Sequence, residues 1–515
     1  MNIQIKYITY LVVIMMGAAS CKKADFTAIN TDPTSSTAKN FEPNYILTTL
    51  QLNYTGSSDF GFEVGATELS GAAVFIQHLA SVSGLFYGDK YLRNPAGWGA
   101  YFDHAYQYQI KFAVDLVENT MGKPKYNNLY QIARIVKAMA FERLTDIYGD
   151  VPYSQAGLGY YNGLYTPKYD RQQDIYADLI KEVQQATDSL NDNGDAVTGD
   201  LFYSTKSDQI ETWKRFGNTL LLRMAMRLTK VDPERAKSYV TLVQGKTMQG
   251  NADDAIVMHD PNGGTVTQNR IALYLVSQQQ INSAKLSKPF VDSLKNNQDP
   301  RLAIIAALPD GTSDTAAQAG LPNGYDETAS LTTGISHFPG YLGSLNKYSQ
   351  PAPALIDYGG PSFILTYAES ELLLADAAAR WGIGDAASHY NNAVIAAMKE
   401  LKAYPGSTPI SDADAQAYLS AHPYDPANGL DMINTQFWIA TFFNDYEAWS
   451  NWRRTGYPIL TPVNYHGNVT GGTIPRRMAY PTSEQQSNGA NYKAAVAASL
   501  PTGDNLVSRM WWDVQ

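Results

Sequence analysis

Cysteine is almost absent from this 515-residue sequence, since Cys21 is the only one. A lone cysteine makes no internal disulfide, and the lack of others excludes disulfide scaffolds, zinc ribbons and further thiol nucleophiles. Basic residues are also scarce: 39 Lys and Arg face 49 Asp and Glu, which gives a formal net charge of −10. Because phosphate binding requires a basic face, no nucleic-acid partner is expected.

Long apolar runs and catalytic signatures are missing as well. Beyond the first twenty residues no apolar stretch is long enough for a transmembrane helix. The sequence shows no Gly-x-Ser-x-Gly, P-loop or dinucleotide fingerprint, and its seven histidines lack metal-ligand spacing. We therefore expect no cofactor and no metal site. The acidic run 191–195 lacks the spacing of a calcium loop and is interpreted as the end of a helix.

The start of the chain carries the strongest local pattern. An apolar run at 7–16 follows Lys6 and ends in small residues immediately before Cys21. This order is typical of a bacterial lipoprotein signal peptide, in which the cysteine is lipidated and becomes the new N-terminus. We predict a signal peptide over 1–20, lipidation of Cys21 and a polar tether over 21–40. The alternative is an ordinary cleaved signal peptide with an incidental cysteine.

Helical periodicity dominates the rest of the sequence. It predicts helices over 45–54, 67–81, 101–119, 126–148, 208–230, 234–243, 288–296, 363–381, 385–402, 412–421 and 434–452, with a further one ending near Leu190. Alanines of 363–381 facing those of 385–402 indicate close helix packing: Ala375, Ala377, Ala378 and Ala379 against Ala386, Ala387, Ala393 and Ala397. We predict an all-α fold in which tetratricopeptide-like helix pairs support a large irregular region, within one domain over 41–515.

Five segments together resemble a known family. They read LTDIYGDVPYSQA at 144–156, PKYD at 167–170, YAESELLLADA at 367–377, WSNWRRTGYP at 449–458 and IPRRMAYP at 474–481. In this order, behind a lipidation signal, the sequence resembles the SusD/RagB outer-membrane lipoproteins of Bacteroidetes, in particular the SusD-like branch.

The resemblance implies a non-enzymatic, surface-exposed lipoprotein of the outer membrane. Such a protein binds a nutrient oligosaccharide and delivers it to a SusC-like TonB-dependent barrel transporter. An oligopeptide is the alternative ligand, and a lipoprotein glycoside hydrolase is the alternative from another class.

The candidate binding segment is 83–101, which is rich in glycine and in aromatic residues. The chain as a whole has 35 tyrosines and 8 tryptophans, whose apolar faces and polar edges suit half-polar ligands. Sugar C–H faces stack on aromatic rings, and Asp and Arg bind hydroxyls. The candidate ligand-binding residues are Tyr87, Asp89, Tyr91, Arg93, Trp98 and Tyr101.

Packing onto the scaffold and contact with the barrel are equal alternatives for each of these residues. The flanking Gly97 and Gly99 favour an exposed Trp98. The irregular region around Tyr341 and Tyr348 is the alternative location of the binding site.

Charged motifs also have two interpretations. Asp146 and Asp150 could form a hydrolytic carboxylate pair, but we favour a structural role in which they fix a turn and pair with arginines. The doublets 453–454 and 476–477 are interpreted as partly buried arginines that meet carboxylates such as Asp445, Glu447 or Glu484, with anion binding as the alternative.

Overall fold

The computed structural model describes residues 42–515, and Asn44–Gln515 forms one compact unit. The chain is 54% helical with few small strands, which confirms the all-α prediction. Within the described chain, no helix is long and apolar enough to cross a membrane. The predicted signal peptide, Cys21 and the tether lie outside the described residues.

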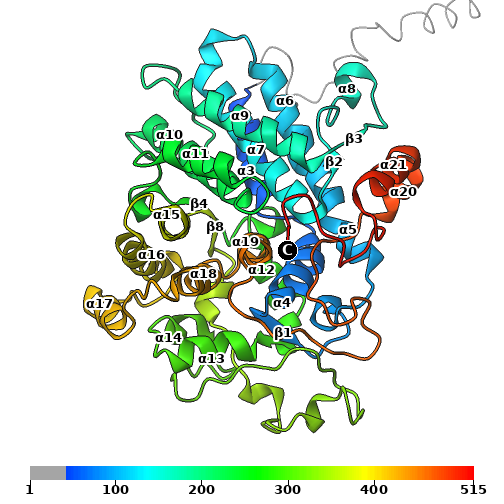
Figure 1. The fold of residues 1–515 in the computed structure, drawn as a ribbon, viewed down its shortest axis with the longest axis vertical. Helices are drawn as coiled ribbons and strands as arrows, with labels where there is room; N and C mark the ends of the chain where they lie inside the picture. Colours follow the sequence, from blue (N-terminus) through cyan, green and yellow to red (C-terminus); the bar gives the residue numbers. More distant parts are fainter. Residues whose placement is uncertain (1–41) are drawn as a thin grey trace, which may run out of the picture. The chain divides into compact units, whose positions relative to one another are not determined.

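The principal helices follow one another along most of the chain (Figure 1). They are α3 (Asn44–Tyr54), η1 (Val64–Ala72), α4 (Ala73–Phe75), α5 (Pro95–His104), η3 (Ala105–Ile110), α6 (Lys111–Thr120), α7 (Asn127–Tyr148), α8 (Gly159–Asn162), α9 (Gln172–Asp188), α10 (Gln209–Arg227), α11 (Pro233–Val243), α12 (Arg270–Ala272), α13 (Lys288–Asn296), α14 (Leu302–Ile305), α15 (Tyr367–Trp381), α16 (Ala386–Glu400), α17 (Asp412–Ala421), α18 (Gly429–Ala440), α19 (Asp445–Thr455), α20 (Thr482–Ser487) and α21 (Gly489–Ser499).

The strands form four separate two-stranded antiparallel ladders. The pairs are β1 (Leu79–Ser81) with β5 (Ala284–Leu286), β2 (Val151–Pro152) with β3 (Tyr169–Asp170), β4 (Ala255–Met258) with β8 (Pro361–Leu365), and β6 (Ala306–Ala307) with β7 (Gln350–Pro351). None of them builds a larger sheet, so each ladder ties two distant segments of a helical scaffold together.

Three predicted helix boundaries differ from those in the structure. The helix predicted over 67–81 ends at Phe75, because 79–81 pairs as β1. Residues 361–365 form β8, and α15 begins only after Thr366, whose side chain accepts a bond from the Glu369 amide (3.2 Å). The helix predicted over 434–452 is two helices, separated by a turn in which Phe443 has a φ of 68°.

The alanine-rich pair α15 and α16 is present as predicted. Ala375, Ala377, Ala393 and Ala397 are buried between or beside the two helices, and the helices contact each other along their lengths. Gly382 ends α15 in the left-handed region at a φ of 68°, which only glycine adopts without strain. Ala379 is exposed, so it lies outside the predicted contact.

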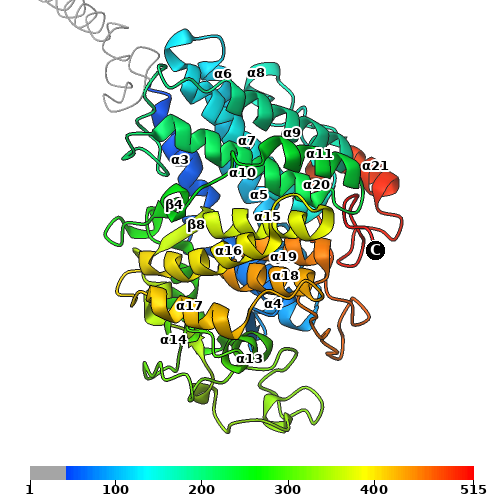
Figure 2. The same ribbon diagram turned by 60° about the vertical axis from the view of Figure 1, so that its left-hand side comes forward.

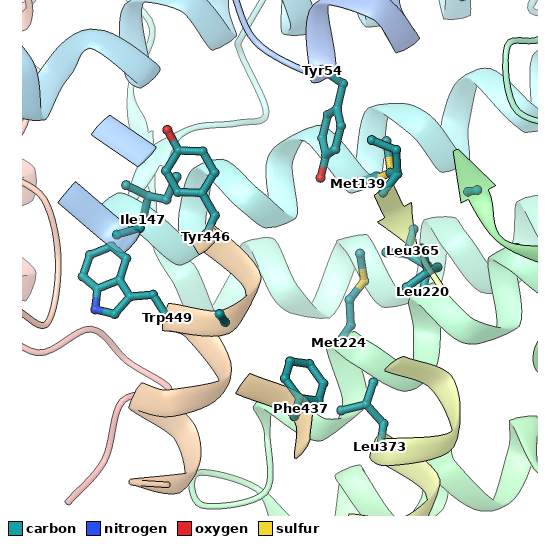
Figure 3. Close-up of a cluster of buried hydrophobic side chains, with 14 of the residues drawn as sticks. Tyr54, Met139, Ile147, Leu220, Met224, Leu365, Leu373, Phe437, Tyr446 and Trp449 are labelled. Atoms are coloured by element: carbon teal, nitrogen blue, oxygen red, sulfur yellow. The ribbon is translucent and has the colours of Figure 1, made fainter. Parts of the chain in front are cut away.

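Figures 1 and 2 show how the helices divide. Helices α3, α6, α7, α9, α10 and α11 gather at one end, and α15–α19 lie beside them. The irregular chain that follows α14, yellow-green in both figures, forms the opposite end. Figure 3 shows the core between these groups, where Met139 of α7, Leu220 and Met224 of α10, Leu373 of α15 and Phe437 of α18 meet with almost no exposed surface.

Two arginines of α10 cross this core and bind carboxylates from three other helices. Arg223 donates to both carboxylate oxygens of Glu369 (2.6 and 2.8 Å). Arg227 donates to Asp146 (3.0 Å) and to Glu447 (2.5 Å). All five side chains are buried. Buried charges are tolerated only when paired and hydrogen-bonded, so α7, α10, α15 and α19 are held in one arrangement.

The structural interpretation of the aspartates in 144–156 is therefore correct for Asp146. Asp150 forms no ion pair with an arginine of the described chain. It accepts from the backbone amide of Gln172 (2.8 Å), the first residue of α9, and from the hydroxyl of Ser499. Asp146 also accepts from Tyr176 and Trp512, so it has no free face for hydrolytic chemistry.

The arginine doublets are buried, as predicted, but their partners differ from those named. Arg454 pairs with Asp376 (3.0 Å), Arg476 with Asp513, and Arg477 with Asp504. Asp445, Glu447 and Glu484 are bound to other groups.

Arg453 has no carboxylate partner within residues 42–515. Its guanidinium lies over the Trp449 ring, 3.9 Å from the centroid, and donates to the carbonyl of Asp146 (2.6 Å). Burial lowers its pKa to about 9.

Replacing one core arginine tests how much this network stabilises the fold. Arg223→Met leaves Glu369 buried and unpaired, so we expect a loss of about 3–5 kcal/mol in the free energy of unfolding. The control is Arg235→Ala, since Arg235 is half exposed beside Asp232 and its loss should cost less than about 0.5 kcal/mol. Urea denaturation measures both. Equal midpoints for the two variants would contradict the role of the network.

Candidate functional site

Three irregular segments, 82–94, 321–348 and 457–473, are bonded to one another on the side of the molecule where β1 ends; we call this surface the loop face. It includes much of the irregular end of the unit in Figure 1. The β1–β5 ladder brings the first segment to the second, with Leu79 opposite Leu286 and Ser81 opposite Ala284. Backbone bonds from Leu286 to Ser349 (2.8 Å) and from Leu321 to Leu286 (2.9 Å) extend this junction.

The loop face has a small core of its own, separate from the main core. Ala80, Val82, Leu321, Ile335 and Tyr348 are buried together. The rings of Tyr325, Phe338 and Tyr341 pack against them while remaining partly exposed. Small satellite cores of this kind are what holds long loops in a fixed arrangement.

Asp89 fixes the second segment. Its carboxylate is fully buried and accepts from Asn323 Nδ2 (2.6 Å) and from the Gly324 amide (2.9 Å). The neighbouring Lys90 donates to the carbonyls of Ser81 (2.8 Å) and Ser83 (3.2 Å). Burial raises the pKa of Asp89 and lowers that of Lys90. These residues determine the conformation of the turn that precedes Tyr325.

Tyr91 fixes the third segment. Its buried hydroxyl accepts from the Val463 amide (3.3 Å), and its carbonyl accepts from the Val469 amide (2.9 Å). Tyr91 has a φ of 52°, so the chain turns sharply here and directs the ring beneath the third segment.

The second and third segments are also joined directly. Tyr465 donates to Asp326 (2.7 Å), which accepts from the Thr328 amide as well (2.8 Å). Burial alone would raise the pKa of Asp326, but hydrogen bonds from Thr328 and Tyr465 outweigh it and lower the pKa to about 2. Asp326 is therefore ionised at every physiological pH, and the junction does not depend on pH there.

A cleft of about 440 Å³ opens between the second and third segments, Gln77 and the start of α13. Tyr325 supplies an aromatic ring, set edge-on against Phe338 with centroids 5.4 Å apart. Asn323 and Asn464 supply amides, and Thr332 and Thr461 supply hydroxyls. The Oδ1 atom of Asn323 has no hydrogen-bond partner in the described chain. A cleft of this size, with one ring and several amides and hydroxyls, suits a ligand that is apolar on one face and hydroxylated at its edge.

The six predicted ligand-binding residues divide into two groups. Arg93 is exposed and Tyr87 is half-buried. Asp89, Tyr91, Trp98 and Tyr101 are buried to 1% exposure or less, so they offer no face to a ligand. Asp89 and Tyr91 support the loop face from beneath. The partly exposed rings of the loop face that lie outside the predicted set are Tyr325, Phe338 and Tyr465, whereas Tyr341 belongs to the predicted alternative location of the site.

The prediction that Trp98 is exposed is wrong. Asn94 accepts from the Gly97 amide (3.0 Å) and Pro95 starts α5, so the predicted loop ends here and Trp98 turns inward. Its ring lies 5.6 Å from that of Phe75. A Cβ on Gly99 would lie 2.4 Å from that of Pro481, so this glycine permits close packing rather than exposure.

Trp98 should therefore act on stability. Trp98→Ala removes a fully buried ring, and we expect the free energy of unfolding to fall by about 3–5 kcal/mol. Thermal or urea denaturation measures it, with the exposed Tyr160→Ala as the control, since Tyr160 is 91% exposed. A melting temperature equal to that of the unmodified protein would contradict the buried position.

Metal ligands do not gather in the part of the chain that the structure describes. No group of three or more His, Cys, Asp or Glu there could hold a metal ion. His78 lies in the core, bonded to Asp445 (2.6 Å) and to the Trp438 carbonyl (2.8 Å), and burial lowers its pKa to about 3. The segment 191–195 contacts the start of α7, where Asp195 accepts a hydrogen bond from the Asn128 amide (2.6 Å).

Comparison with known proteins places this architecture among binding proteins. Residues 45–481 match the SusD-like family described as starch-binding and associating with the outer membrane. A comparison with curated proteins finds no match.

Solved structures resemble the chain over its length. One is a chitin-binding protein, 34% identical, with a TM-score of 0.81, covering 92% of this chain and 100% of its own. A Bacteroidetes AC2a SusD-like protein is 26% identical, with a TM-score of 0.79 and the same coverage. A chitin-binding SusD homologue from Flavobacterium johnsoniae shares the fold at 23% identity, with a TM-score of 0.77, over 92% of this chain and 99% of its own.

Proposed function

The chain belongs to the SusD-like family, and we propose that its loop face binds a nutrient oligosaccharide. The observation that carries this proposal is the cleft beside Tyr325, which combines a partly exposed ring with amides and hydroxyls held in place by buried anchors. Aromatic rings receive the C–H face of a sugar, while amides and hydroxyls bind its hydroxyl groups. Carbohydrate binding is also the activity for which the family is described.

We propose a chitin-type oligosaccharide, a β-linked chain of N-acetylglucosamine, as the first ligand to test. The chitin-binding protein that is 34% identical spans nearly the whole chain. The acetamido group adds a methyl and an amide to each sugar, and the cleft offers partners for both: the ring of Tyr325 and the side chains of Asn323 and Asn464.

The cleft fits a protein that binds a glycan better than it fits a glycoside hydrolase. Glycoside hydrolysis requires two carboxyl groups that flank the scissile bond. Among the described residues that line the cleft, Asp292 is the one carboxylate, and it pairs with Lys288 one helical turn earlier. The geometry thus lacks the second carboxyl group.

Delivery to a SusC-like TonB-dependent barrel, from a lipid anchor at Cys21, completes the proposed function. An open cleft buries only part of its ligand, so affinity for a short glycan should be modest. A modest affinity suits a protein that captures a ligand and then releases it to a transporter.

Removing the ring from the cleft tests the binding site. Tyr325→Ala should weaken binding of an N-acetylglucosamine tetramer about three- to tenfold, because an aromatic contact contributes roughly 0.5–1.5 kcal/mol. Isothermal titration measures the affinity, and Tyr160→Ala, on α8 and outside the cleft, is the matched control. If Tyr325→Ala binds as tightly as the unmodified protein to every glycan that binds, the ligand lies elsewhere.

Changing the anchor tests the location. Cys21→Ala should release the protein from the membrane fraction or leave it uncleaved, since two or three acyl chains hold a protein far better than one, at ~0.8 kcal/mol per buried methylene. A Cys21→Ala variant that stays on the outer membrane after a high-salt wash would contradict the lipid anchor.

Purification of the unmodified lipoprotein in mild detergent should recover a much larger β-barrel protein with it. An unmodified protein recovered alone would contradict the barrel partner.

A further inference from the structure

A second pocket, of about 340 Å³, lies between the end of α3, the loop 55–63 and the α5–η3 helix; we call it the α5 pocket. It shares no residue with the cleft on the loop face. Its volume lies within the range of small-molecule sites. The proposed function does not involve this pocket.

Two side chains at the base of the α5 pocket are buried with unused hydrogen-bonding atoms. His104 is 5% exposed, and its Nε2 is bonded to the Asn53 carbonyl (2.9 Å). Glu63 is 3% exposed, and its Oε1 accepts from Tyr446 (3.0 Å). The Nδ1 of His104 and the Oε2 of Glu63 have no partner among the residues described. Such atoms are rare in native interiors, because leaving them unpaired is costly.

Both residues stand where a helix becomes wider. Glu63 immediately precedes the π-helical segment η1, and His104 immediately precedes η3. π-Helical turns are rare, and they occur frequently at functional sites. Each π-helical segment therefore begins directly after a residue that lines the α5 pocket.

The rim of the α5 pocket carries two exposed rings. Phe62 is 56% exposed and Tyr108 is 47% exposed, and both line the pocket. Tyr108 stacks on His104 with centroids 5.3 Å apart, so its orientation is fixed. Large apolar side chains left exposed beside polar groups are typical of ligand sites.

Polar groups complete the lining. Asp103 is half-buried and accepts from Ser483 (2.8 Å), and Asp59 and Gln107 are exposed at the rim. The carboxylates and the amide accept hydrogen bonds from hydroxyl groups, and the rings receive an apolar face. A ligand that offers both, at the size of this pocket, is a sugar ring.

We propose that the α5 pocket is a second saccharide site, in which one sugar unit lies against Phe62 and Tyr108 and its hydroxyls bind Asp59, Asp103 and Gln107. The proposal takes its ligand class from the proposed function but stands on different residues. Two separate sites on one chain would let a long glycan, or two glycan ends, bind the same protein at once.

Stoichiometry is the direct test. The probes are tetrasaccharides of β-linked N-acetylglucosamine, β-linked glucose and α-linked glucose, titrated calorimetrically into the full lipid-free protein. We expect two ligands per chain for at least one probe. Tyr108→Ala and Phe62→Ala should each weaken one of the two sites at least fivefold and leave the other unchanged. Both rings are exposed, so neither change removes core packing.

Phe60→Ala is the matched control. Phe60 is 54% exposed in the same loop but does not line the α5 pocket, so this variant should bind like the unmodified protein. A Tyr325→Ala background should keep the α5 site unchanged and weaken the loop-face site.

The two proposals fail in different ways. A single site that Tyr325→Ala weakens and Tyr108→Ala leaves unchanged would overturn the second site and support the loop face. A single site that Tyr108→Ala abolishes and Tyr325→Ala spares would support the α5 pocket and overturn the loop face. Equal effects of Phe60→Ala and Phe62→Ala, or no binding of any probe, would overturn the α5 proposal.

Discussion

The arrangement of this protein depends on charges buried in its core. Arg223 and Arg227 of α10 bind carboxylates from α7, α15 and α19, segments that lie far apart in the sequence. An apolar core tolerates small shifts of its helices, but a buried ion pair loses its hydrogen bonds when they shift. Burial also raises the pKa of the nearby Glu142 to about 8, and its carboxylate lies 3.5 Å from the Arg223 guanidinium. The relative positions of these helices are therefore fixed by the geometry of the buried ion pairs as well as by hydrophobic burial.

The sequence predicted the helical scaffold well because its signals are local. The alanines of α15 and α16 and the capping residues around them are visible within thirty residues of chain. What failed depended on distant contacts. Residues 79–81 become a strand only because 284–286 lie beside them, and the split between α18 and α19 accommodates a turn at Phe443 that no periodicity shows.

The proposed cleft and the predicted binding segment 83–101 are joined in the structure but share no lining residue. Asp89 and Tyr91 belong to the loop face, yet they lie beneath it, while Tyr325 and Tyr465 come from segments more than two hundred residues further along. A glycine beside an aromatic residue can either leave the ring exposed or let the ring pack closely against another segment. Gly99 allows close packing against Pro481, which is almost four hundred residues away in the sequence.

The anchors of the loop face have a mechanical consequence. Asp89 holds one long segment and Tyr91, two residues later, holds another, so both are fastened to the same short turn. Tyr465 then joins the two segments to each other through Asp326. Each of the three segments of the loop face is thus bonded to the other two, so none of them can shift without breaking a bond to another. A single contact would leave each segment free to rotate about it. The loop face is therefore preorganised for a ligand, and less binding free energy is lost in ordering its segments.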